Sequence, residues 1–201
     1  DVLTGTCSHG QGQETSFAQI AADVLGVSPD DVRVHRGDTA RIPDGVGTFG
    51  SRATAVGGSA VFEAAGKIAR KLKRIAAGLL KVPEEYVTRE GDAFVAGEKS
   101  IADAEVCFQA HRAAALPPGV APGLEETYFF EPENFTFPFG AHVCMASVDR
   151  ETGEVKVERY FAVDDCGKVI NPLLVDGQVH GGIAQGLGQA LLEEAVYDED
   201  G

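Results

Sequence analysis

Residues 50–79 read GSRATAVGGSAVFEAAGKIARKLKRIAAGL and predict a long helix that is entered through a glycine-containing loop. Apolar side chains recur there at helical spacing, with lysines and arginines on the opposite face. Because alanine dominates the first half of the apolar face, we expect another element to pack closely against it. The apolar positions are Val56, Ala60, Val61, Ala64, Ile68, Leu72, Ile75 and Leu79.

A second glycine loop and a second helix precede this stretch. The loop GQG at 10–12 leads into apolar positions 17, 20, 21, 24 and 25, and Gly26 follows. This spacing predicts a helix that ends at a C-terminal glycine. Residues 29–31 (PDD) predict a turn, residues 32–35 (VRVH) a short strand, and residues 37–50 a loop.

On the C-terminal side, residues 86–96 predict a hairpin around Glu90-Gly91-Asp92. Residues 100–103 (SIAD) are typical of a helix N-terminal cap, and we expect a helix over 105–112. The Pro- and Gly-rich residues 116–123 predict a linker between two lobes, 1–115 and 124–201.

In the second lobe, residues 141–149 and 155–165 alternate in hydrophobicity on either side of RETGE at 150–154. They predict a β-hairpin with Gly153 in a left-handed conformation. Asn171-Pro172 predicts the start of a glycine-rich helix that runs toward Leu192. No tandem repeat or regular strand–helix alternation is present, so we expect an α+β fold in which a two-layer mixed sheet packs with helices.

Composition argues against several partners. The formal net charge is −14, whereas nucleic-acid binding depends on clustered lysine and arginine. The apolar stretches are shorter than the roughly 18–20 residues of a membrane span, so no transmembrane segment is expected. Residues 1–4 (DVLT) lack the features of a signal peptide, and we expect a cytoplasmic chain cut from a longer polypeptide.

The cysteines and histidines predict no metal site. Cys7, Cys107, Cys144 and Cys166 form no C-x-x-C pair, and the histidines show no H-x-x-x-H spacing. Buried free thiols in a reducing compartment are the plain interpretation. A Gly-x-Ser-x-Gly motif is also absent from the sequence, so hydrolase chemistry has no support.

Three glycine segments have the composition of anion-binding loops: GQGQET at 10–15, GTFGSRAT at 47–54 and GQVHGG at 177–182. The first two directly precede predicted helices, whose unpaired N–H groups favour phosphate. Arg52 adds a permanent charge. The alternative is that the glycines serve turns and that Arg52 pairs with a local carboxylate. Neither loop matches the dinucleotide or P-loop fingerprint, but together they predict a polyanionic or dinucleotide-like ligand.

Six motifs in one order carry a resemblance to a known family. They are GQGQET at 10–15, GSRAT at 50–54, FPFG at 137–140, DDCG at 164–167, INP at 170–172 and GQVHGG at 177–182. In this order they resemble the molybdopterin-binding region of the xanthine oxidase and aldehyde oxidase family over nearly the whole chain. Within the family the chain most resembles the large subunits of aerobic carbon monoxide dehydrogenases.

The resemblance implies a molybdenum–molybdopterin cytosine dinucleotide cofactor, with the metal held by the dithiolene sulfurs of the pterin. Gln11 and Gln178, whose amides also suit amide-like heterocyclic rings, would contact the pterin region. The loop 50–54 would hold the pyrophosphate or nucleotide end. The expected cofactor-binding residues are Gly10, Gln11, Gly12, Gln13, Glu14, Gly50, Ser51, Arg52, Ala53, Thr54 and Gln178.

The resemblance also implies what this stretch lacks. The glutamate near molybdenum lies in a downstream Gly-Glu motif, and the copper-binding cysteine of the carbon monoxide enzymes lies upstream. We therefore expect no catalytic residue and no metal ligand here, and an inactive isolated fragment. FAD and [2Fe-2S] clusters would sit on partner subunits, and water would supply the transferred oxygen.

The substrate stays open between carbon monoxide, an aldehyde and an N-heterocycle, and Gln13 departs from the histidine typical of the carbon monoxide enzymes. Two alternatives also stay open. The first is a non-catalytic domain that binds a nucleotide or packs against a subunit. The second is a stand-alone molybdopterin carrier.

Overall fold

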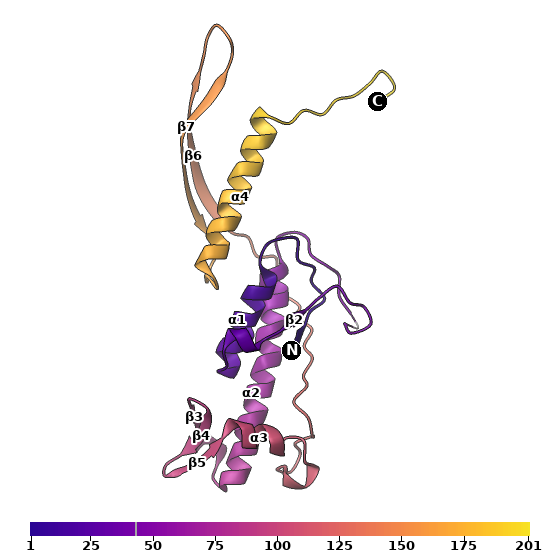
Figure 1. The fold of residues 1–201 in the computed structure, drawn as a ribbon, viewed down its shortest axis with the longest axis vertical. Helices are drawn as coiled ribbons and strands as arrows, with labels where there is room; N and C mark the ends of the chain where they lie inside the picture. Colours follow the sequence, from indigo (N-terminus) through magenta and orange to yellow (C-terminus); the bar gives the residue numbers. More distant parts are fainter. Residues whose placement is uncertain (43) are drawn as a thin grey trace. The chain divides into compact units, whose positions relative to one another are not determined.

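The computed structural model describes residues 1–42 and 44–201; Pro43, inside the predicted loop 37–50, lies outside the described residues. The chain divides into two compact units, Asp1–Glu133 and Asn134–Gly201. Figure 1 labels most of the helices and strands of each unit.

The first unit is built around a helix pair. Helix α1 (Gln13–Leu25) packs against the N-terminal half of α2 (Ser59–Leu80), and Phe17, Ala21 and Val61 form the core between them. A short parallel pair, β1 (Val2–Leu3) and β2 (Val34–His35), lies beside α1. Both predicted helices are confirmed, and Gly26 ends α1 in a left-handed conformation.

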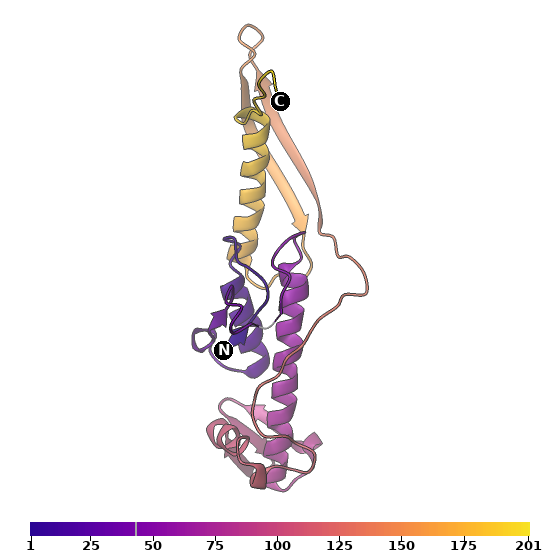
Figure 2. The same cartoon turned by 90° about the vertical axis from the view of Figure 1, so that its right-hand side faces the viewer.

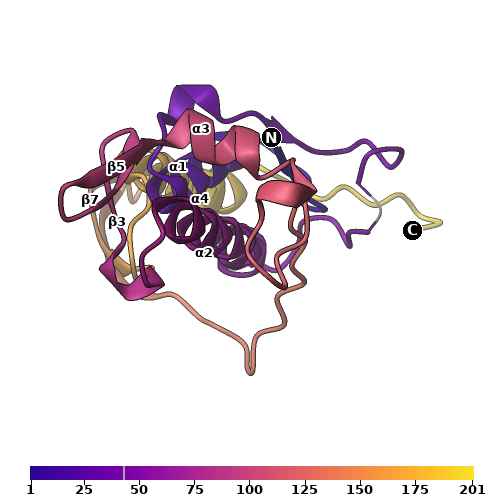
Figure 3. The ribbon, with the colours of Figure 1, turned by 90° about the horizontal axis from the view of Figure 1, so that it is seen from below.

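The C-terminal half of α2 belongs to a second core. Strands β3 (Thr88–Glu90), β4 (Ala93–Ala96) and β5 (Lys99–Ala102) form an antiparallel sheet that packs there together with α3 (Asp103–Gln109). Figure 2 shows these elements gathered at the C-terminal end of α2, and in Figure 3 α1 and α3 lie on the same side of that helix. Ile75, Val87 and Val106 are fully buried in this core.

One local prediction in this region is wrong. Residues 99–102 extend the sheet as β5, with Ser100 opposite Val95 and Ile101 opposite Phe94, and do not cap a helix. Helix α3 begins at Asp103 without a side-chain cap. These residues form a strand because Ile101 then packs against the core at α2. In a free capping turn, the Ile101 side chain would be exposed.

The stretch 116–123, predicted as a linker, packs on the first unit. Leu116 and Val120 lie against the second core, Gly123 N–H donates to the Ala110 carbonyl at 2.9 Å, and Arg74 donates to the Pro118 carbonyl at 2.8 Å. The division between units therefore falls after Glu133 in this structure. Where the lobes divide in a longer protein stays a prediction.

The second unit consists of a hairpin and a helix. Strands β6 (Phe139–Val148) and β7 (Val155–Asp165) pair antiparallel with a bulge between Met145 and Ala146, and α4 (Pro172–Leu191) follows. The predicted turn is confirmed, with Gly153 at φ 77°. So is the predicted helix start, where the Asn171 side chain accepts the Leu174 N–H at 3.1 Å.

These elements confirm the α+β class. Within residues 1–42 and 44–201 the strands lie in three small separate sheets, one parallel and two antiparallel, and not in the single mixed sheet that was expected, because each short strand group packs on its own helix or pairs only with its neighbour. Short one-turn helices lie at Pro29–Asp31, Glu84–Tyr86 and Ala113–Ala115. Across residues 1–42 and 44–201, none of the helices combines the length and the apolar character that crossing a membrane requires.

Candidate functional site

The loop before α1 is held open by glycines. Gly10 and Gly12 have φ values of 103° and 72°, in the left-handed region that L side chains rarely adopt. Gly12 is the N-cap of α1 and has no side chain to cap the helix. First-turn N–H groups other than that of Glu14 therefore have no capping side chain and can meet an anionic ligand.

The loop before α2 has the same character. Gly47 and Gly50 have φ values of 79° and 62°, and Ser51 takes a φ of 52° without being a glycine. A β-carbon at Gly10, Gly47 or Gly50 would meet no atom within 4 Å, so open space lies over all three. A left-handed serine costs energy, and such strain is concentrated at functional sites. A π-helical turn, Ala53–Gly58, joins this loop to α2.

Arg52 carries the positive charge of this loop. Its guanidinium carbon lies 4.2 Å from the centroid of the Phe49 ring, which is 55% exposed. Within residues 1–42 and 44–201, no carboxylate forms an ion pair with Arg52. Stacking occupies a face of the guanidinium and leaves its edge donors for a ligand. The local ion pair considered as an alternative is thus not formed in the described part of the chain.

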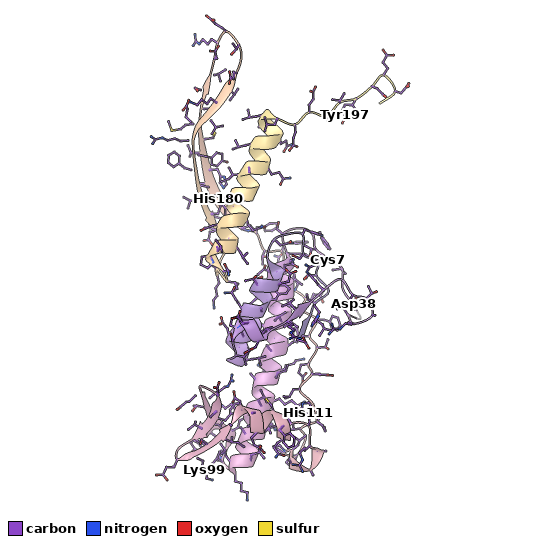
Figure 4. The ribbon with its side chains drawn as sticks, viewed as in Figure 1. Cys7, Asp38, Lys99, His111, His180 and Tyr197 are labelled. Atoms are coloured by element: carbon purple, nitrogen blue, oxygen red, sulfur yellow. The ribbon has the colours of Figure 1, made fainter. Side chains whose placement is uncertain are left out.

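A buried polar network joins the two loops. The Gln13 side chain, 1% exposed, accepts from the Thr6 hydroxyl at 3.0 Å and donates to the Thr48 hydroxyl at 3.4 Å. Cys7 N–H donates to the same Thr48 oxygen at 2.9 Å, and Figure 4 marks Cys7 in the loop before α1. Segments 4–7 and 44–48 also touch through their backbones, because a β-carbon on Gly5 would lie 2.4 Å from Gly45 Cα.

The structure therefore places the side chain of Gln13 inside the protein, where it ties the loops together. A direct contact of Gln13 with a cofactor stays a prediction. Thr6 and Thr48 were not singled out from the sequence. The available signal was that Thr6 precedes the first glycine loop and Thr48 lies within the second, and threonine is too common in turns for this to be informative.

Glu14 forms an ion pair with Arg36 at the start of α1. The pKa of the Glu14 carboxyl is lowered, first because it accepts its own backbone N–H and then because of Arg36, while partial burial opposes the shift. An ionised Glu14 with a cationic partner adds no strong repulsion toward an anion nearby. Arg36 lies 22 positions along the chain, a pairing that helical spacing could not predict.

Because the pKa of Glu14 is lower in the folded state, its contribution to stability is present above the unfolded pKa near 4.5 and is lost as the pH falls further. We expect Glu14→Gln to lower the free energy of unfolding at pH 7 by under about 1 kcal/mol, since the pair is partly exposed. The difference from the unsubstituted protein should be smaller at pH 3 than at pH 7, as urea unfolding at the two pH values would show. Arg36→Gln should have a smaller effect because the backbone N–H contact remains. An equal loss at both pH values would contradict this assignment.

The remaining predicted site residues have different environments. Gln11 accepts from the His9 N–H through its carbonyl oxygen, which leaves its amide N–H groups available. Ala53 is buried, whereas Thr54 is exposed. Gln178 is exposed on α4 in the second unit. That Gln178 joins the loops of the first unit at one cofactor stays a prediction.

The hairpin of the second unit has a polar cluster that the sequence did not indicate. The His142 ring bonds the Tyr160 hydroxyl at 3.1 Å and an Asp164 carboxylate oxygen at 3.0 Å. His142, Cys144 and Tyr160 line a groove of about 320 Å³ with Gly182, Ile183, Gly186 and Leu187 of α4. Alternation in β6 places His142 and Cys144 on one face, but cross-strand pairing is visible only in the folded hairpin.

All four cysteines are free. Cys7 and Cys107 are half-buried, and burial raises the pKa of the Cys107 thiol. Cys144 and Cys166 are exposed, so the expectation of buried thiols is wrong for these two. In the part of the chain that the structure describes, no group of three His, Cys, Asp or Glu side chains is arranged to hold a metal ion.

Comparison with known proteins gives consistent matches. Residues 1–201 match the family model of the molybdopterin cofactor-binding domain. The chain is 43% identical to the carbon monoxide dehydrogenase large chain of Hydrogenophaga pseudoflava over 98% of this chain and 25% of that one. It is 39% identical to the nicotine 6-hydroxylase large subunit of Paenarthrobacter nicotinovorans over 100% of this chain and 25% of that subunit.

A solved structure, that of Cu,Mo-CO dehydrogenase in its carbon monoxide reduced state, superposes with a TM-score of 0.90 at 42% identity. The superposition covers 99% of this chain and 25% of that one. The chain thus spans about a quarter of the length of the relatives it matches.

Proposed function

Because the chain belongs to the molybdopterin cofactor-binding domain family, we propose that its first unit holds the anionic, nucleotide part of the cofactor in the glycine loops before α1 and α2. The observation that carries this proposal is the pairing of two open loops around an arginine with no carboxylate partner in the described chain. Phosphate oxygens are the acceptors that such N–H groups and guanidinium edges prefer.

The residues present fit this group. The open space over Gly10, Gly47 and Gly50 admits a ligand to the backbone, and Phe49 holds the Arg52 guanidinium by one face. Gln11 would donate its amide N–H groups to the pterin, and Gln178 would do the same from the second unit. The pyrophosphate would lie against Gly10, Gly12, Gly50, Ser51, Arg52, Ala53 and Thr54, with Glu14 beside it and Gln13 beneath.

When bound, the cofactor supplies the molybdenum and its redox chemistry. The residues of this chain bind the cofactor, orient it and exclude water from its phosphates; none is assigned a catalytic role. We propose that the whole protein oxidises carbon monoxide or hydroxylates an aldehyde or N-heterocycle with oxygen from water. The relatives are named as large chains or subunits, which supports partner subunits carrying FAD and [2Fe-2S] clusters. The cytoplasmic location stays a prediction.

The dinucleotide form of the cofactor can be tested chemically. We expect mild acid hydrolysis of the purified full-length protein to release cytidine monophosphate in a one-to-one ratio with oxidised pterin. Pterin without any nucleotide would contradict the cytosine dinucleotide and leave plain molybdopterin. The longer reading frame offers a second check, since a Gly-Glu motif downstream is expected of a catalytic large subunit and its absence would favour a carrier or a non-catalytic domain.

A specific observation also supports a packing role for the second unit. Phe139, Ala141, Val143, Phe161 and Val163 share one face of the β6–β7 hairpin, and the four larger ones are each more than half exposed. A contiguous apolar face of this kind marks a protein–protein interface. We propose that the remainder of a longer subunit covers it, so that packing accompanies cofactor binding.

A further inference from the structure

The network between the two glycine loops has a fixed hydrogen-bond direction. The Gln13 carbonyl oxygen can only accept, so Thr6 must donate its hydroxyl proton to it. Since that proton is used, the 3.1 Å bond between the hydroxyls of Thr4 and Thr6 must be donated by Thr4. The Gln13 amide then donates onward to Thr48.

Thr48 is where this chain of donors ends. Its hydroxyl oxygen accepts from Cys7 N–H at 2.9 Å and from the Gln13 amide at 3.4 Å. A hydroxyl has two acceptor lone pairs and one proton. Both lone pairs of Thr48 are therefore occupied, and its proton is the remaining group for a further partner. Thr48 can bond such a partner only as a donor.

The position of Thr48 makes this donor accessible. Thr48 is half-buried and lies between Gly47 and the Phe49 ring that stacks on Arg52, in the loop whose glycines have open space above them. Gln13 is buried beneath Thr48, and its side-chain amide donates to the Thr48 hydroxyl oxygen from the interior of the protein. A ligand that meets this loop thus meets the arginine and one hydroxyl proton, both of which require an acceptor.

We propose that Thr48 is a further binding residue for the cofactor, and that it donates its hydroxyl proton to a phosphate oxygen. Gln13 is the positioning residue that keeps the proton outward, because its amide N–H occupies the lone pair on the inner side. This proposal rests on the proposed function. It also gives Gln13 a role in place of a direct contact with the cofactor.

Three variants of the full-length protein in its complex test the proposal. Thr48→Val removes the hydroxyl while keeping the shape, and Thr48→Ser keeps the hydroxyl. Gln13→Glu still bridges Thr6 and Thr48, but its carboxylate only accepts and so turns the Thr48 proton inward. The matched control is Thr88→Val, an exposed threonine on β3.

The readout is the rate at which pterin is released during dialysis, measured by the fluorescence of the oxidised pterin, alongside the unfolding temperature of each apoprotein. We expect release to accelerate about tenfold or more in Thr48→Val and in Gln13→Glu, the usual scale for a hydrogen bond to a charged group. Thr48→Ser should release pterin at nearly the original rate, and Thr88→Val at the original rate.

Two outcomes would overturn the proposal. The first is a Thr48→Val protein that retains pterin like the unsubstituted protein. The second is a set of release rates that follow only the apoprotein unfolding temperatures, which would make the network purely structural. An unsubstituted protein that carries no pterin under adequate molybdenum supply would instead overturn the proposed function itself.

Discussion

Replacing Arg52 by alanine in the full-length protein is expected to lower the pterin and molybdenum content of the purified complex at least about tenfold, because a charged hydrogen bond to phosphate contributes about 1.5–3 kcal/mol. Arg52 has no carboxylate partner in the described chain, so the substitution leaves no protein charge uncompensated. Molybdenum by metal analysis and pterin by fluorescence, each per mole of protein, measure the effect.

The matched control is Arg150→Ala, which removes an exposed arginine from the turn between β6 and β7 and should leave the cofactor content unchanged. Arg52→Lys keeps the charge but loses the forked donors, and we expect an intermediate content. An Arg52→Ala protein with full cofactor content would show that Arg52 does not bind the cofactor.

Phe17→Ala is expected to have the largest effect on stability. The Phe17 ring is fully buried, and its edge lies against the π-helical turn, where a β-carbon on Gly57 would be 3.0 Å from the ring. Truncating a phenylalanine in such a core costs about 3–5 kcal/mol. Because the π-helical turn follows directly on the loop before α2, losing this contact should also disturb the alignment of the two glycine loops. Urea unfolding of the chain measures the loss.

Phe62→Ala provides the control, since Phe62 lies on α2 but is 55% exposed. We expect it to change the free energy of unfolding by under about 0.5 kcal/mol. If Phe17→Ala were as mild as Phe62→Ala, the packing of α1 on the π-helical turn would not be what holds the two loops.

The parts of the fold that sequence predicts well are those with local causes. Periodicity defines α1 and α2, Gly26 and Asn171-Pro172 mark helix ends, and Gly153 marks the hairpin turn. Strand β5 was missed because its pairing with β4, and not its own composition, makes it a strand. The packing of residues 116–123 on the first unit depends likewise on contacts with distant residues such as Arg74.

The candidate site follows the same division. The glycine loops and Arg52 are readable from the sequence because each has a local signature. The pairing of Gln13 with Thr48 is 35 positions apart, and that of Glu14 with Arg36 is 22 apart. Neither separation corresponds to a helix or strand period, so only the folded chain shows that Gln13 is buried and that Thr48 is its partner.

Metal and pterin analysis of the intact protein tests the central claim most directly. The full-length subunit, purified with its partners from cells supplied with molybdate, should contain molybdenum and pterin in a one-to-one ratio, close to one of each per subunit. A correctly folded complex that holds neither, under the same supply, would contradict the account.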